Sequence, residues 1–226
     1  MSTAVAAAPT ASTGETTIYA SRAYRWRISL TAVSLLAGLA VTLLSGPMPV
    51  HSFWTNTTLM VLSWITLALG LAIRLWGTTA IAGRKGSQVV CEGPYALCRN
   101  PLYWGTLLIA VSMTLFLQSG AFAVSLIPPV LLYLFGVVPA EERFLRHRLG
   151  RDYTKYCEGT PRWLPKWNGG SLLRTTPASL GSSPASLGAW HAECRRQLVW
   201  LLLPLLAYAI CVTRNLAWWP QSFFFS

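Results

Sequence analysis

Two polar segments stand out in an otherwise apolar chain of 226 residues. The first, GPYALCRNPLYWG at residues 93–105, places Arg99, Asn100 and Tyr103 at the start of a long apolar run. The second, residues 139–165, carries the adjacent acids Glu141 and Glu142 directly after another apolar run. Guanidinium, amide and carboxylate groups bind charged small molecules through charge-assisted hydrogen bonds. These two segments therefore hold the candidate site residues.

Each of these residues also has a purely structural explanation. Pro101 suits the first turn of a helix, where its missing N–H costs nothing, and Asn100 then falls at the N-cap, where its side chain can bond a free backbone N–H. Arg99 can anchor at lipid headgroups. The two acids can pair with the arginines that follow them in the chain, which are Arg143, Arg146 and Arg148.

The elements that must position these segments are apolar helices. The chain is 53% apolar and only 11% charged, with a mean hydropathy of +0.45, whereas a soluble domain carries about 25% charged residues. We expect an all-α, polytopic membrane protein with about five transmembrane helices. They are predicted at residues 28–45, 57–73, 102–117, 121–138 and 198–213. The third and fourth predict a tight hairpin, whose second arm Pro128 and Pro129 should kink.

The basic residues predict the orientation of the chain in the membrane. The net charge is +11, but the Lys and Arg residues gather in every second loop, which is the positive-inside pattern. The N-terminus and the second and fourth loops are therefore expected on the cytoplasmic side of a bacterial inner membrane or an ER-type membrane. The same distribution favours anionic-lipid contact over nucleic-acid binding.

Composition divides the rest of the chain. Residues 1–24 are expected to be a disordered tail, 25–168 the membrane core, 169–196 a Gly/Ser/Pro-rich linker containing Pro-Ala-Ser-Leu-Gly twice, and 197–226 an additional helix with its tail. Within the second polar segment, an apolar stripe predicts a helix that ends at Gly150, with His147 on its surface. The five cysteines form no CxxC pair, so no metal site is expected.

Together the two segments resemble the signatures of integral-membrane methyltransferases. GPYALCRNPLYWG resembles a Gly-Pro-Tyr, Arg-His/Asn-Pro, Tyr-x-Gly motif, and EERFLRHRLGRDYTKYCEGTPRWLP resembles a second motif with a Glu-Glu pair, a Gly-x-x-Tyr-x-x-Tyr run and a closing Pro-Arg and Pro. Their order, flanking a helical hairpin, is also the family's, and the resemblance covers about residues 57–165. That family includes isoprenylcysteine carboxyl methyltransferases and bacterial phospholipid N-methyltransferases.

The resemblance implies methyl transfer from S-adenosylmethionine, bound at the cytoplasmic membrane edge, to a lipid or another lipophilic acceptor in the bilayer. It implies catalytic roles for Glu142, Arg99 and Tyr103. The implied cofactor-binding residues are Tyr95, Arg99, Asn100, Pro101, Tyr103, Gly105, Glu141, Glu142 and Tyr153. Asn100 departs from the family, which often has a histidine there, so any role that needs an imidazole is absent. The acceptor stays open among a prenylcysteine carboxylate, a phospholipid amine and a hydrophobic thiol.

Two other classes of protein remain as alternatives. One is an NADPH-dependent membrane reductase of the sterol type, which has a related helical core but is longer than this chain. The other is a non-catalytic membrane scaffold. Stabilisation by S-adenosylmethionine, by NADPH or by neither would separate the three. The sequence carries no information on oligomeric state.

Overall fold

The structure, a computed structural model, describes residues 22–45, 52–82, 84, 88–165 and 184–214. The elements of this part are helical. In chain order they are α2 (Arg22–Leu44), α3 (Phe53–Ile81), α4 (Pro94–Leu97), α5 (Pro101–Leu117), α6 (Gly120–Ser125), α7 (Ile127–Leu132), η1 (Tyr133–Val137), α8 (Val138–Gly159) and α9 (Pro184–Arg214). The all-α prediction is confirmed. Most of the expected disordered tail and the first half of the expected linker lie outside the described residues.

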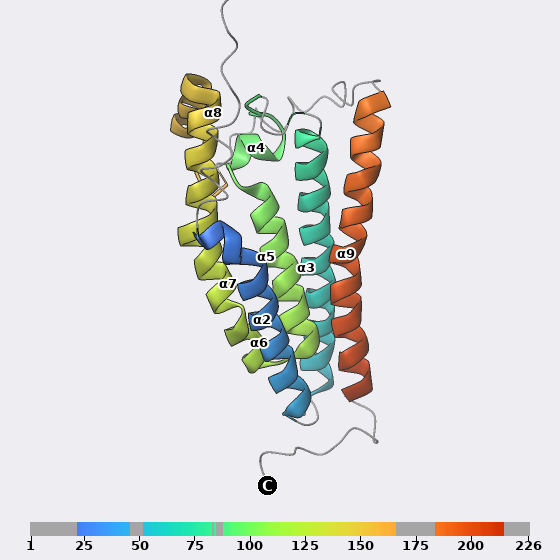
Figure 1. Ribbon diagram of the computed structural model, residues 1–226. Helices are drawn as coiled ribbons and strands as arrows, with labels where there is room; N and C mark the ends of the chain where they lie inside the picture. Colours follow the sequence, from blue (N-terminus) through green and yellow to red (C-terminus); the bar gives the residue numbers. More distant parts are fainter. Residues whose placement is uncertain (1–21, 46–51, 83, 85–87, 166–183, 215–226) are drawn as a thin grey trace, which may run out of the picture.

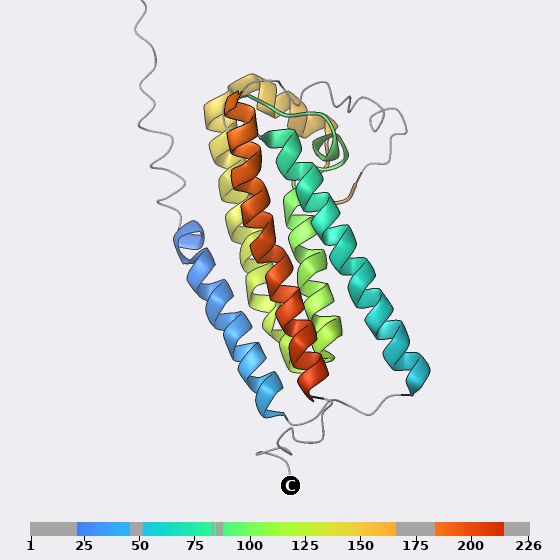
Figure 2. The same cartoon turned by 90° about the vertical axis from the view of Figure 1, so that its right-hand side faces the viewer.

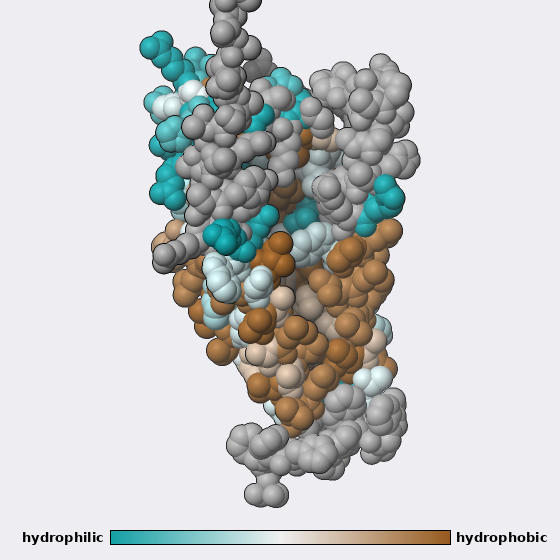
Figure 3. All heavy atoms as spheres, viewed as in Figure 1, coloured by the Kyte–Doolittle hydropathy of each residue, from teal (hydrophilic) through white to brown (hydrophobic). Residues whose placement is uncertain are grey.

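Five apolar helical segments, called rods below, form a bundle, as predicted. Three runs are long and apolar enough to cross a membrane, namely Arg25–Leu44, Phe53–Ile81 and Gly120–Gly159, and two shorter ones are Pro101–Leu117 and Leu198–Arg214. Large apolar side chains such as those of Leu36 (65% exposed), Trp54 (77%) and Phe135 (77%) face outward. Figure 3 shows these residue types as an apolar band below a hydrophilic end. The protein is an integral membrane protein with several spans.

The rods alternate in direction, which brings both polar segments to one end of the bundle. In Figure 1, α2, α5 and α9 run one way, and α3 and the α6–α8 run the other way. The start of α5, the whole of α4 and most of α8 lie at the same end. The hairpin formed by α5 and the α6–α8 run starts and ends at the same end of the bundle, so the two polar segments meet there although they are far apart in sequence.

That hairpin turns at Gln118, which adopts a left-handed conformation with φ 46°. The Ser119 side chain then caps α6 by accepting from the backbone N–H of Phe122. The second arm is broken where the prolines predicted, because α7 restarts with Pro128 and Pro129 in its first turn.

A π-helical turn, η1, carries the second arm into α8. The N–H of Val138 donates to the carbonyl of Tyr133, five residues back. Pro139 follows and has no N–H, so the carbonyl of Phe135 has no α-helical partner at that position. Isolated π turns often occur beside functional sites, and this one directly precedes Glu141 and Glu142.

Gly150 divides α8 as the sequence predicted. Its φ of 58° and ψ of −129° are not helical. The chain changes direction there, and residues 151–159 form a second helical stretch that Figure 2 shows across the end of the bundle. Residues 160–165 then return toward the start of α5.

Close packing fixes α5 against α3. A Cβ on Gly105 would lie 2.5 Å from Cγ of Arg74 and 2.8 Å from the carbonyl oxygen of Gly70. Around this contact, Leu67, Ile109 and Phe116 form the buried apolar core. Small residues are what allow two backbones to approach in this way.

Helix α9 is part of the same bundle. It packs on α5 and α3, as Figure 2 shows from its own side. The rings of Tyr208 and Phe116 meet edge to face with centroids 5.6 Å apart. The helix begins at Pro184, inside the segment expected to be a linker, so helical structure extends further toward the N-terminus than the composition indicated.

Candidate functional site

Glu142 is the centre of the polar end of the bundle. Glu142 is only 4% exposed, and its carboxylate is held by two guanidinium groups. Nη1 of Arg99 lies 3.2 Å from Oε1. Arg162 donates from Nε to both oxygens at 3.1 Å and from Nη2 to Oε2 at 2.6 Å. A carboxylate with so little access to water is stable as an anion only when paired in this way.

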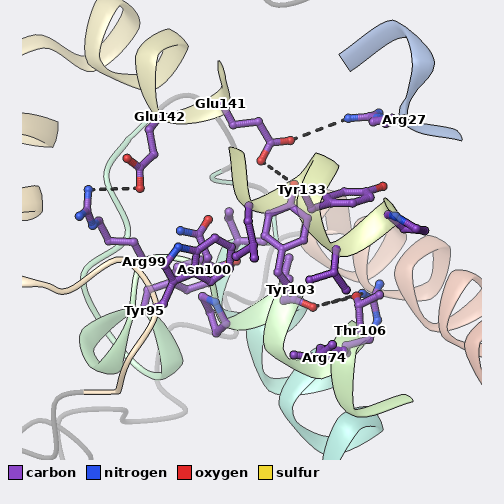
Figure 4. A pocket seen from close by; sticks show the side chains of 18 of the residues that line it. Arg27, Arg74, Tyr95, Arg99, Asn100, Tyr103, Thr106, Tyr133, Glu141 and Glu142 are labelled. Atoms are coloured by element: carbon purple, nitrogen blue, oxygen red, sulfur yellow. Dashed lines mark hydrogen bonds and ion pairs between the residues drawn. The ribbon is translucent and has the colours of Figure 1, made fainter. Parts of the chain in front are cut away.

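Arg162 was not among the predicted site residues. It comes from the closing Pro-Arg of the second signature, so the motif contained the signal but assigned it no role. The hydrogen bonds to Glu142 raise the pKa of the Arg162 guanidinium above its usual value. The Arg99–Glu142 proximity, on which the predicted site depends, is present in the structure (Figure 4).

Arg99 has unused hydrogen-bonding capacity. Its Nε and Nη1 atoms are buried and have no hydrogen-bond acceptor among the described residues. Nη1 is within ion-pair distance of Glu142, but that contact does not have hydrogen-bond geometry. Buried N–H groups without an acceptor are costly. Their presence here indicates a place for an anionic group of a ligand.

Glu141 faces a different set of partners. The hydroxyl of Tyr103 donates to its Oε2 at 2.8 Å, and Nη1 of Arg27 lies 3.9 Å from its Oε1. The Tyr103 ring packs against Tyr133 of η1, with centroids 5.3 Å apart. Arg27 comes from α2 and was not among the predicted site residues. The partners that the structure shows for the two acids come from other elements of the fold and from the segment after α8, rather than from the arginines directly after them.

The loop before α5 is held by the returning segment 160–165. The N–H of Arg99 donates to the carbonyl of Pro161 at 2.9 Å, and Nδ2 of Asn100 donates to the carbonyl of Arg162 at 3.2 Å. Nε1 of Trp104 donates to the carbonyl of Trp163 at 2.6 Å. Asn100 does occupy the N-cap position, but it makes no side-chain cap. The predicted capping bond is therefore wrong, since the amide is used to join the two signatures.

Tyrosines complete the polar end. Gly93, with φ 60°, starts the turn into α4, which buries Tyr95. The hydroxyl of Tyr156 donates to the carbonyl of Tyr95 at 2.7 Å, and the Tyr156 ring packs against that of Tyr153 at 5.8 Å between centroids. The Gly-x-x-Tyr-x-x-Tyr run of the second signature thus packs onto the Gly-Pro-Tyr of the first.

These groups surround one cavity of about 950 Å³. All the predicted site residues line it except Gly105. The missing Cβ of Gly105 makes room for α3 rather than for a ligand, so its assignment to the cofactor site is corrected. The Phe144, Leu145 and Leu149 stripe of α8 also faces the cavity, whereas His147 is exposed as predicted.

The cavity continues from the polar end into the bundle. Its deeper walls are apolar and come from several helices. They include Leu35 of α2, Ile109 and Met113 of α5, Val130 of α7 and Leu203 of α9. This shape, with charges at one end and aliphatic side chains at the other, suits a charged ligand and an apolar ligand that meet inside the protein.

Cys98, in the first polar segment, is not placed to act as a nucleophile. Burial raises the pKa of the Cys98 thiol, so it stays protonated and is a poor nucleophile. Within residues 22–165 and 184–214, apart from the gaps given above, no group of three or more His, Cys, Asp or Glu side chains is placed to hold a metal ion.

The chain is similar to integral-membrane methyltransferases over part of its length. Residues 50–152 match the model of the phospholipid methyltransferase family. The matched residues are just under half of the chain and include the first signature and the start of the second, which confirms the resemblance carried by the two signatures.

Individual relatives match over different lengths. The cobalt-zinc-cadmium resistance protein CzcN of Cupriavidus metallidurans is 30% identical over 141 residues, 62% of each chain. The nickel-cobalt-cadmium resistance protein NccN of Alcaligenes xylosoxydans xylosoxydans is 23% identical over 195 residues, 86% of this chain and 85% of the relative. Protein-S-isoprenylcysteine O-methyltransferase B of Arabidopsis thaliana is 30% identical over 78 residues, 34% of this chain and 40% of the plant protein. The match thus spans less than two thirds of CzcN and of the plant enzyme. No solved structure matches the chain significantly.

Proposed function

We propose that the protein is an S-adenosylmethionine-dependent methyltransferase whose acceptor is a lipid or another lipophilic molecule. The observation that carries this proposal is Arg99. Two of its buried N–H groups have no hydrogen-bond acceptor, Arg99 lines a cavity that also has an apolar part, and it lies within the residues that match a methyltransferase family. The location at the polar end of a membrane bundle gives access to both water and lipid.

The residues present fit the cofactor. The free N–H groups of Arg99 would hold its carboxylate, a charge-assisted contact. Glu141 would pair with its ammonium, because Glu142 already has two guanidinium partners. Tyr95 and Tyr153 offer aromatic faces for the adenosine. When bound, S-adenosylmethionine supplies a methyl group on a positively charged sulfur that is open to attack by a nucleophile.

The contribution of the chain to the reaction is alignment and exclusion of water. The loop before α5 is fixed by hydrogen bonds from Arg99, Asn100 and Trp104 to residues 161–163. A loop held this rigidly keeps the donor and the acceptor in line without further ordering, which lowers the entropic part of the barrier. The cavity walls keep bulk water from competing as nucleophile.

Proton transfer depends on the acceptor. A carboxylate acceptor is already ionised at neutral pH, whereas an amine or a thiol must lose a proton. Glu141 is the acid placed for this step, since the carboxylate of Glu142 is already enclosed by Arg99 and Arg162. We propose that Glu142 organises the cofactor loop and that Glu141 takes the proton where one must leave.

Ligand-induced thermal stabilisation tests the proposal. Full-length protein in an uncharged detergent would be heated with S-adenosylmethionine, S-adenosylhomocysteine or NADPH. We expect a higher Tm with the first two, because a ligand bound by the folded state alone stabilises it by mass action. A response to NADPH alone would favour the reductase, and no response to any ligand would favour the scaffold.

Substitutions at the centre of the site sharpen this test. We expect Arg99→Ala and Glu142→Gln each to weaken cofactor binding about tenfold or more, as loss of a charge-assisted hydrogen bond implies. Arg146→Ala is the matched control, because Arg146 is exposed on the same helix as Glu142. If both site variants bind the cofactor as well as the control does, the site lies elsewhere.

A further inference from the structure

Helix α3 contains a single charged residue, Arg74, in an otherwise uncharged sequence of 29 residues. The sequence placed Arg74 at the end of a span, but α3 continues for two more turns to Ile81. A charge within an apolar span is costly and usually faces the bundle interior or a cavity. Arg74 does face the cavity, and neither the cofactor contacts nor the proton transfer proposed above uses it.

Arg74 is held in a defined position. Its Nη1 donates to Oγ1 of Thr106 at 2.5 Å and to the carbonyl of Leu102 at 3.5 Å. Its guanidinium carbon lies 4.1 Å from the centre of the Trp200 ring, which is within the range of a cation–π contact. Figure 4 shows the Arg74–Thr106 pair apart from the contacts of Glu141 and Glu142.

The position of Arg74 along the cavity is also informative. Thr106 lies six residues after Asn100, which corresponds to about 9 Å along a helix axis. Beyond Thr106, the residues of α5 that line the cavity are Leu107, Ile109, Ala110 and Met113. Arg74 therefore lies where the polar end gives way to the apolar part, the level at which the head of an amphiphile would sit if its tail filled the deeper cavity.

The charge balance favours an anionic head. Among the described residues, the cavity is lined by the arginines Arg27, Arg74, Arg99 and Arg148 and by the acids Glu141 and Glu142. Arg99 pairs with Glu142, and Arg27 lies beside Glu141. Four arginines against two acids give these lining residues a net positive charge, which attracts an anion, and the effect is strongest inside a cavity with apolar walls.

Helix α9 completes this part of the cavity. Trp200 and Leu203 line it, and Trp200 covers the guanidinium of Arg74. Both lie beyond residues 50–152, where the family model matches. An arginine that stacks on an aromatic ring keeps its N–H groups in the guanidinium plane for an acceptor.

We propose that Arg74, positioned by Thr106 and Trp200, binds the anionic group of an amphiphilic ligand, a carboxylate or a phosphate on an alkyl chain, and that α9 thereby forms part of the acceptor site. This ligand is the methyl acceptor only if the protein is the methyltransferase proposed above, so this part of the proposal rests on that function. The binding itself is measured without methyl transfer.

Four probes separate the head from the tail. Full-length protein in an uncharged detergent would be titrated with dodecanoate, dodecyl phosphate, dodecanol and inorganic phosphate, and its Tm measured. We expect stabilisation by dodecanoate, dodecyl phosphate or both, and at most a small effect of dodecanol or inorganic phosphate. Equal stabilisation by dodecanol, or no stabilisation by either anionic amphiphile, would overturn the proposal.

Variants assign the effect to Arg74. Arg74→Gln should weaken binding of the anionic amphiphile about tenfold or more, and Arg74→Lys should retain part of this binding. Trp200→Phe should weaken binding less than Trp200→Leu does, because phenylalanine keeps an aromatic face. Arg146→Gln is the matched control for loss of an exposed charge. Unchanged binding by Arg74→Gln would refute the assignment.

Binding of S-adenosylhomocysteine is measured on the same variants. Arg74→Gln should retain it, since Arg74 lies apart from the cofactor contacts. Loss of both ligands together would mean that Arg74 serves the packing of the bundle, and the proposal would fail. If the native chain binds the anionic amphiphile through Arg74 but never binds S-adenosylhomocysteine, the methyltransferase proposal fails while the anionic site stands.

Discussion

At the scale of single residues, the site is organised by a carboxylate that almost no water reaches. Glu142 forms ion pairs with Arg99 of the first signature and Arg162 of the second. One acid thus joins the two segments, and the buried N–H groups of Arg99 remain for a ligand. The two adjacent acids have different surroundings, so they are suited to different tasks although they are neighbours in sequence.

Arg162 tests this arrangement, because it supplies three of the hydrogen bonds to Glu142. We expect Arg162→Ala to lower the stability of the folded state by about 1–3 kcal/mol and to weaken binding of S-adenosylhomocysteine, since Glu142 would then draw Arg99 away from the ligand. Thermal unfolding and ligand titration in detergent measure both effects. Arg143→Ala, which removes an exposed arginine next to Glu142, should change neither. Equal behaviour of the two variants would contradict this role.

At the scale of elements, two glycines position the helices that carry the site. Gly105 lets α5 approach α3 at the level of Arg74, and Gly150 lets α8 change direction so that residues 160–165 reach Arg99. The first is a matter of space and the second of backbone conformation. Each can be tested with the smallest possible side chain.

Gly105→Ala should destabilise the bundle. The added Cβ would lie 2.8 Å from a backbone oxygen of α3, which cannot move without shifting the helix, so we expect a loss of about 1–3 kcal/mol. Gly120→Ala is the control, because nothing lies within 4 Å of its added Cβ. Thermal unfolding of both variants measures the difference, and a Gly105→Ala protein as stable as Gly120→Ala would show that the two helices can separate freely.

Gly150→Ala should affect the site through the backbone. Its φ of 58° and ψ of −129° lie in a region that is nearly restricted to glycine, at a cost of about 1–3 kcal/mol for another residue. We expect weaker binding of S-adenosylhomocysteine, because the segment that holds Arg99 and Asn100 would be displaced. Gly159→Ala has no neighbour within 4 Å of its added Cβ and no positive φ, and it should bind normally. Normal binding by Gly150→Ala would mean that the break in α8 is not needed.

At the scale of the whole molecule, the bundle has one hydrophilic end and one apolar band (Figure 3). The described basic residues of the second and fourth loops, among them Arg84 and Arg151, lie at the end that holds the site, so the positive-inside rule predicts that this end faces the cytoplasm. That orientation would open the polar part of the cavity to a water-soluble cofactor and leave the apolar part at the depth of the lipid.

Thiol labelling in bacterial cells that express the chain tests the orientation. With Cys91 as the sole cysteine, we expect a membrane-impermeant maleimide to react only after the cells are permeabilised. A cysteine-free chain carrying Ser45→Cys, at the exposed far end of α2, should react in intact cells. Burial, followed by the charge of Glu92, raises the pKa of the Cys91 thiol, so the labelling rate should rise with pH as the thiolate fraction grows. The reverse labelling pattern would invert the proposed topology.

The sequence by itself determined the five apolar helices, the hairpin with its proline break, the helix end at Gly150 and the two polar segments. These follow from local causes, which are the length of apolar runs, the missing N–H of proline and the φ that glycine permits. The tertiary structure alone decided the partners. Asn100 bonds a carbonyl 62 residues away instead of capping its own helix, Arg27 reaches Glu141 from α2, and Trp200 covers Arg74 from α9. Such contacts depend on which helix faces join in the bundle, and hydrophobic patterns that are apolar on all sides do not encode that choice.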